Sequence, residues 1–98
     1  MIIGNIYIND TIGSEEGQTG IELQDVVMQV EAKKHCDTLH IYITSPGGDV
    51  HKGKAIAKYV SSLPNAFTIA DQLCGSIATE IHLAVPLERR KIIAGTDY

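Results

Sequence analysis

Apolar and polar residues follow two different periods along this chain, and these periods predict its strands and helices. Residues 38–44 alternate strictly, with Leu39, Ile41 and Ile43 on one side, as in a half-buried strand. In other segments the apolar residues recur at spacings of three and four, which is typical of amphipathic helices. The pattern predicts strands at 5–8, 38–44, 66–70 and 91–94 and helices at 21–34, 50–63 and 76–85.

The predicted elements alternate in the order β-α-β-α-β-α-β. Short connections between alternating strands and helices favour an α/β fold with a mainly parallel sheet and right-handed crossovers. We therefore expect a single domain over residues 1–98. Catalytic groups on such a sheet are expected in the turns at the carboxyl ends of the strands. Two turns, at residues 45–49 and 71–76, hold residues suited to chemistry.

Composition and charge exclude several classes of function. The formal net charge is −4 and no basic face is evident, which argues against a nucleic-acid partner. No segment approaches the roughly 18 apolar residues of a membrane span, and residues 1–4 do not resemble a signal peptide. We expect a cytoplasmic protein without a membrane partner. Cys36 and Cys74 do not match the spacing of metal ligands, so we expect reduced thiols, no metal and no cofactor.

The first turn has the sequence Ser-Pro-Gly-Gly-Asp at residues 45–49. Proline fixes one backbone angle, and the paired glycines permit positive φ, so backbone N–H groups can point outward between strand and helix. Such N–H groups can stabilise an oxyanion. We predict that Gly48 has a positive φ, or requires the absence of a Cβ, and turns its N–H toward Ser76. The alternative is a plain tight turn in which Asp49 caps the next helix.

The second turn places Ser76 directly after Gly75, at the start of a predicted helix. A serine there lies at the positive end of the helix dipole, where negative charge is stabilised. It is a candidate nucleophile, with the N–H of Ile77 beside it. The alternative is an ordinary N-cap serine, which is a favoured residue at that position.

Taken together, the two turns resemble those of the Clp protease family. Residues 41–50, IYITSPGGDV, with Gly53, Ala55 and Ile56, are similar to the family motif YINSPGGxVxxGxAI. Residues 74–78, CGSIA, are similar to the family's GxAASxA block around its nucleophile. The short N-terminus and the Gly-Gly-Asp-Val sequence resemble the prophage branch, which includes capsid-maturation peptidases. The resemblance implies the N-terminal half of a ClpP/crotonase-like domain.

The resemblance also implies a role for each matching residue. Ser76 would be the acylated nucleophile of a serine endopeptidase, and the N–H groups of Gly48 and Ile77 would form its oxyanion hole. A peptide or protein substrate would pair like an added strand with the first turn. The residues along that substrate would be Gly47, Asp49 and Val50. The family further implies a homo-oligomer, whereas the few residues before the first strand argue against an ATPase unfoldase partner.

The chain departs from the family pattern at two points. Gln72 replaces a glycine four positions before the nucleophile, which we expect to alter the turn or the substrate cleft. The family's histidine and aspartate would fall beyond Tyr98, so we expect this chain to be inactive alone. His82 is predicted to lie on the helix of Ser76 but rotated away from it. We expect the histidines to be exposed or half-buried and Cys74 to face the core.

Two other functions remain open from the sequence. The same fold could serve as a noncatalytic peptide-binding or assembly module, in which the first turn holds a peptide that is not cleaved. A signal-peptide-peptidase-like protease also carries a Ser-Pro-Gly-Gly turn and would use a lysine base beyond Tyr98. Crotonase-type acyl-CoA enzymes share the general fold, but the Ser-Pro-Gly-Gly turn argues against them.

Overall fold

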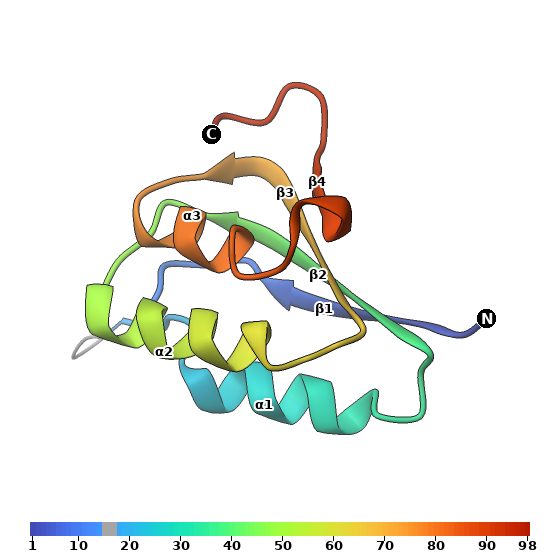
Figure 1. The fold of residues 1–98 in the computed structure, drawn as a ribbon. Coiled ribbons are helices and arrows are strands. Elements are labelled where there is room, and N and C mark those ends of the chain that lie inside the picture. Colours follow the sequence, from blue (N-terminus) through green and yellow to red (C-terminus); the bar gives the residue numbers. More distant parts are fainter. Residues whose placement is uncertain (15–17) are drawn as a thin grey trace.

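The computed structural model describes residues 1–14 and 18–98, and it has the α/β fold that the sequence predicts (Figure 1). Four parallel strands form a single sheet in the order β1-β2-β3-β4. The strands are β1 (Ile3–Ile8), β2 (Thr38–Ser45), β3 (Ala66–Cys74) and β4 (Arg90–Ile92). The helices are α1 (Leu23–Ala32), α2 (Val50–Ser61), α3 (Ile77–His82) and a 3₁₀ turn at Leu87–Arg89.

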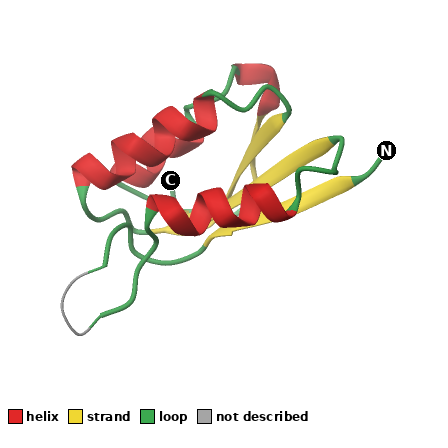
Figure 2. Cartoon of the chain, turned by 90° about the horizontal axis from the view of Figure 1, so that it is seen from below, coloured by secondary structure: helices red, strands yellow, loops and turns green. Residues whose placement is uncertain are grey.

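The three α-helices cover the same face of the sheet, as Figure 2 shows. Strand order equals chain order and every neighbouring pair is parallel, so each right-handed crossover places its helix on one side. The core between these layers is aliphatic, as expected for a chain with little aromatic content. Its fully buried side chains include Ile6, Ile8, Ile41, Ile43, Ile56, Val26 and Val60.

The opposite face of the sheet carries aromatic side chains. Tyr7 stacks on Tyr42 with ring centroids 5.6 Å apart, and His40 meets Phe67 edge-on at 5.4 Å. Tyr7 is 47% exposed, and none of the described helices packs over this face. Half-buried aromatic pairs of this kind stabilise neighbouring strands, and they leave apolar surface available to a partner.

The structure corrects the predicted end of β3. Residues 71–74 were expected to belong to the turn at 71–76, but the strand continues to Cys74. The pairing with β2 shifts between Ile43 and Ser45, so β3 carries extra residues there, as in a β-bulge. Asp97 holds this segment from the other side, because Cys74 N–H donates to its carbonyl and its own N–H donates to the Gln72 carbonyl, both at 2.8 Å.

The other boundaries differ by a few residues. Helix α3 ends at His82 rather than at residue 85, and a turn follows it before Pro86. Strand β4 is shorter than predicted, whereas β1 begins two residues earlier at Ile3. Among the described residues, no helix is long and apolar enough to cross a membrane, and no cluster of side chains is suited to bind a metal ion.

Candidate active site

The turn between β2 and α2 combines two unusual backbone conformations with a helix cap. Gly47 has φ +104° and Gly48 has φ +146°, which confirms the positive φ predicted for Gly48. Asp49 caps α2 by accepting a hydrogen bond from the Lys52 N–H at 2.9 Å. The capping role considered from the sequence is therefore present, and it leaves the two glycines available for another purpose.

Ile12 explains why residue 48 must be glycine, and sequence analysis missed this contact. The Ile12 N–H donates to the Gly47 carbonyl at 2.8 Å, and its own carbonyl accepts from the Asp49 N–H at 2.9 Å. A Cβ on Gly48 would lie 2.2 Å from the Ile12 carbonyl oxygen. Ile12 thus pairs with the turn through an isolated parallel β-bridge to Gly48. Because backbone groups alternate in direction along a strand, the Gly48 N–H points away from Ile12.

Ser76 occupies a strained bend between β3 and α3. Its φ of +52° and ψ of −131° are rarely adopted by residues other than glycine. Its side chain is exposed and makes no capping hydrogen bond, so it does not act as the N-cap hydroxyl considered from the sequence. A strained serine between a strand and a helix is also the geometry of a nucleophile elbow, where the hydroxyl is presented to a substrate.

The two turns are neighbours in space. A Cβ on Gly47 would lie 2.6 Å from the Ser76 Cβ and 3.2 Å from its Oγ, so the glycine backbone is in contact with the serine. Standard covalent geometry then places the Gly48 nitrogen within about 7 Å of the Ser76 Oγ. Within the described part of the chain, neither the Gly48 N–H nor the Ile77 N–H donates a hydrogen bond.

Ser45 joins the two turns directly, and sequence analysis did not single it out. It is fully buried, its Oγ accepts a hydrogen bond from the Gly47 N–H at 3.2 Å, and its carbonyl accepts from the Gly75 N–H at 3.0 Å. Gly53, in the family motif, permits a second close contact: a Cβ there would lie 2.3 Å from the Ile77 Cγ1. Helices α2 and α3 therefore pack closely beneath the turns.

Among residues 1–14 and 18–98, no histidine reaches the Ser76 hydroxyl. His35 and His40 lie near the start of β2, at the opposite end of the sheet from Ser45, and His51 is exposed on α2. His82 is 2% exposed, which corrects the expectation that every histidine would be at or near the surface. As predicted, it does not approach Ser76.

The His82 ring is held by two hydrogen bonds. Its Nε2 lies 2.9 Å from the Lys91 carbonyl oxygen, and its Nδ1 lies 2.9 Å from the Tyr98 hydroxyl. A carbonyl only accepts, so Nε2 carries the proton and Nδ1 accepts from Tyr98. Burial lowers the pKa of His82, the Arg90 cation lowers it further, and the bond to Lys91 opposes both. The imidazole is therefore neutral, buried and already paired.

The thiol of Cys74 is not a substitute nucleophile. Its side chain is fully buried in the core, as predicted, and burial raises the pKa of the thiol to about 11. The thiolate is the reactive form of cysteine, and this environment disfavours it. Cys74 and Cys36 are both free thiols.

Gln72 keeps the backbone conformation for which the family pattern has glycine. Its φ is +63°, and its side chain is exposed at the bulge of β3. The left-handed conformation costs a non-glycine residue about 1–2 kcal/mol. The departure from the family pattern therefore places a strained non-glycine residue in the segment before Ser76.

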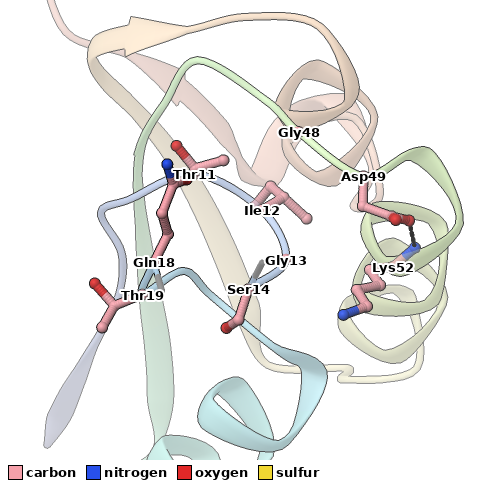
Figure 3. Close-up of a pocket in the computed structure, with 9 residues that line it drawn as sticks. All are labelled: Thr11, Ile12, Gly13, Ser14, Gln18, Thr19, Gly48, Asp49 and Lys52. Atoms are coloured by element: carbon pink, nitrogen blue, oxygen red, sulfur yellow. Dashed lines mark hydrogen bonds between the residues drawn. The ribbon is translucent and has the colours of Figure 1, made fainter. Parts of the chain in front are cut away.

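A pocket of about 240 Å³ lies beside the first turn, on the side of Ile12 (Figure 3). Ser76 is not among its lining residues. The Ser14 N–H donates to the Glu22 carboxylate at 2.5 Å, and Lys52, on one wall, forms an ion pair with it at 3.1 Å; the bond from Ser14 and then the contact with Lys52 lower the pKa of Glu22. The lining residues are Thr11, Ile12, Gly13, Ser14, Gln18, Thr19, Gly48, Asp49 and Lys52.

The structure therefore brings part of the predicted site together. Gly47, Gly48, Ser76 and Ile77 belong to two touching turns. Asp49 caps the helix and also borders the pocket, while the Val50 side chain is 50% exposed to solvent. No described residue supplies a general base to the serine.

Residues 5–98 match the family model of Clp protease. The chain is similar in structure to ClpP1 from Listeria monocytogenes, with a TM-score of 0.78, 23% identity, and coverage of 94% of this chain and 52% of that one. Its N165D mutant gives a TM-score of 0.79 at 23% identity, covering 95% and 53%. The chain thus spans about half the length of these structures. Among curated proteins, none matches the sequence.

Proposed function

Because the chain belongs to the Clp protease family, we propose that it forms the nucleophile-bearing part of a serine endopeptidase. The observation that carries this proposal is the contact between the Gly47 backbone and Ser76. This contact brings an exposed hydroxyl in a strained bend beside two N–H groups, on Gly48 and Ile77, that have no acceptor among the described residues. Such a combination is suited to acyl transfer.

In the proposed mechanism the Ser76 Oγ attacks the carbonyl carbon of a peptide bond, and its proton passes to the general base and from there to the departing amine. The carbonyl oxygen becomes negatively charged and accepts hydrogen bonds from the N–H groups of Gly48 and Ile77. Collapse of this intermediate breaks the C–N bond, releases the amine and leaves an acyl group on Ser76, which water then hydrolyses. The substrate would pair along Gly47, Asp49 and Val50, on the side of the turn that Ile12 leaves open.

The general base and its orienting acid would come from outside the described residues. The family relatives are about twice as long as this chain, so there is room for both groups in the part not matched. The pairing of Asp97 with Leu73 supports one direction of approach. The segment around Asp97 runs parallel to the end of β3. Residues following it in the same direction would reach the turn that holds Ser76.

We further propose that the assembled peptidase is a homo-oligomer of the prophage type, located in the cytoplasm. The Gly-Gly-Asp-Val sequence of the first turn supports the choice of branch. Tyr7, Tyr42 and Phe67 support oligomerisation, because they form an apolar face that no described helix covers. The substrate would be a peptide or protein, and no cofactor is required for the acyl transfer.

A noncatalytic peptide-binding module is the second candidate. It is favoured by one observation, that no described histidine, lysine or carboxylate hydrogen bonds to the Ser76 hydroxyl. In that case the first turn would hold an extended peptide and Ser76 would remain unacylated. A serine–lysine protease would share the acylation of Ser76 and differ in the base that activates it.

Single-turnover acylation tests the proposal and separates it from the second candidate. The chain would be mixed with a peptide p-nitrophenyl ester, with imidazole added as a soluble base, and the intact mass followed over time. An oxyanion hole and binding alone retain about 10³–10⁴-fold catalysis in serine peptidases without a complete triad. We expect one acyl group, mapped to Ser76, and none at that position in Ser76→Ala.

Ser62→Ala is the matched control, because Ser62 is an exposed serine whose hydroxyl donates to the Tyr59 carbonyl away from both turns. It should be acylated at Ser76 at the rate of the unmodified chain. If the ester reacts with Ser62 as fast as with Ser76, the serine has no special reactivity and the peptidase proposal is wrong. Peptide binding without acylation would support the binding module.

A further inference from the structure

Ser45 is in contact with both halves of the proposed site while lying entirely beneath it. Its side chain is 0% exposed, so it cannot touch a substrate. Its Oγ accepts from the Gly47 N–H at 3.2 Å, and its carbonyl accepts from the Gly75 N–H at 3.0 Å. Ser45 therefore hydrogen bonds to Gly47, which precedes Gly48, and to Gly75, which precedes Ser76.

The position of Ser45 in the sheet makes this link rigid. Ser45 is the last residue of β2 and pairs with Cys74 after the register shift that ends the regular ladder. Ile12 anchors the first turn and Asp97 anchors the end of β3, while Ser45 hydrogen bonds to both turns. The buried N–H of Gly47 also needs an acceptor, because an unpaired buried donor loses its hydrogen bonds to water without replacement.

We infer that Ser45 is a positioning residue, whose hydroxyl fixes the distance between the Gly48 N–H and the Ser76 hydroxyl. The inference rests on the proposed function, in which these two groups act on one tetrahedral intermediate. Donors of an oxyanion hole must lie about 2.7–3.1 Å from the developing charge, so a small displacement of the turn weakens the hole. Ser45→Ala removes the hydroxyl acceptor and keeps the carbonyl bond to Gly75.

The test compares two reactions of one thiol in the variant Ser76→Cys. Acylation by a peptide p-nitrophenyl ester passes through an oxyanion, whereas alkylation by iodoacetamide does not. The ratio of the two rates therefore measures oxyanion stabilisation and cancels changes in exposure or thiol pKa. In the double variant Ser45→Ala/Ser76→Cys we expect this ratio to fall roughly tenfold or more, because losing one donor completely costs about 10²–10³-fold.

Two further variants of Ser76→Cys complete the design. Ser45→Thr keeps the hydroxyl acceptor and should restore most of the ratio, while Ser62→Ala should leave it unchanged. Amide hydrogen exchange gives an independent readout if Ser45→Thr is too large for its buried position. Ser45→Ala should then speed exchange at the Gly47 N–H and leave the Gly75 N–H protected.

The outcomes distinguish the inference from the function on which it rests. If Ser76→Cys has the same rate ratio as free N-acetylcysteine, the turns stabilise no oxyanion and the proposed function fails. If its ratio is higher but unchanged by Ser45→Ala, the function stands and the role of Ser45 is wrong. An equal fall in both rates would also overturn the inference, because it indicates a purely structural contribution.

Discussion

Gly47 and Ser76 come from different turns, yet they are so close that a methyl group on the glycine would lie 2.6 Å from the serine Cβ. Real Cβ atoms do not approach other atoms this closely, so the contact requires glycine. It also fixes the geometry of the site, because Gly47 precedes the Gly48 N–H and Ser76 precedes the Ile77 N–H. The candidate oxyanion hole therefore depends on a contact between backbone and side chain.

Gly47→Ala should damage both stability and the reactivity of Ser76. Overpacking costs about 1–3 kcal/mol, and the positive φ adds about 1–2 kcal/mol. Gly95→Ala is the matched control, since Gly95 has φ +88° but no atom within 4 Å of its would-be Cβ. We expect chemical denaturation to show a larger loss for Gly47→Ala than for Gly95→Ala, and ester acylation to fail only in the former. Equal losses would show that backbone strain alone matters.

Gln72→Gly should stabilise the chain. Gln72 has φ +63°, and relief of this strain should stabilise the chain by about 1–2 kcal/mol. The greater freedom of glycine in the unfolded chain should cancel about 0.5–1 kcal/mol of this gain. The net gain should be roughly 0.5–1 kcal/mol in urea denaturation. Gln72→Ala keeps the strain and is the control, with no gain expected. A loss of stability in Gln72→Gly would mean that the exposed amide makes a contribution larger than the strain.

The sequence predicted the fold because its information is local and periodic. Alternation in residues 38–44 and helical spacing in 50–63 depend on which face is buried, and both appear in the structure as expected. The end of β3 was not predictable in this way. Asp71 and Gln72 look like turn residues, and the strand continues because Asp97, far along the chain, pairs with it.

The residues of the candidate site also differ in whether local sequence indicates them. Gly48 and Ser76 were found from motif and turn chemistry, because positive φ and a strand-to-helix bend leave a signature in residue type. Ile12 and Ser45 were missed, since their contribution is a backbone contact and a buried hydroxyl bond between distant segments. The burial of His82 was also missed, because its partners Lys91 and Tyr98 lie outside its helix.

Stability should fall as the pH falls below about 6.5, through His82. Burial lowers the pKa of His82 from its ordinary value of 6.5, so the folded state resists protonation while the unfolded state accepts it. The contribution is complete above pH 6.5 and is lost progressively below it. Thermal unfolding across this range should show a decline that His82→Gln flattens. His35→Gln, at an exposed histidine, is the control, and an identical flattening there would contradict the role of His82.

The chain alone should show no steady turnover of a peptide substrate. No described histidine reaches Ser76, and loss of the base in a serine triad costs several orders of magnitude. Fluorogenic peptide assays without added imidazole should therefore match the Ser76→Ala variant. Turnover that disappears in Ser76→Ala would require a base within this chain. His51→Gln would be the first variant to examine, because His51 follows the first turn.

Self-association is expected at tens of micromolar, through the aromatic face of the sheet. Tyr7 is 47% exposed and stacks on Tyr42, and Ile92 and Ile93 expose apolar surface beside the same sheet, at 55% and 42%. Apolar surface of this extent on a small protein favours association. Sedimentation velocity should show a concentration-dependent increase in mass, which Tyr7→Asp reduces.

Met28→Asp is the control, since Met28 is 62% exposed on α1, a helix that covers the other face. If Met28→Asp disrupts association and Tyr7→Asp does not, the helical layer rather than the sheet forms the contact. A monomer at every concentration would show that the aromatic face needs a different partner.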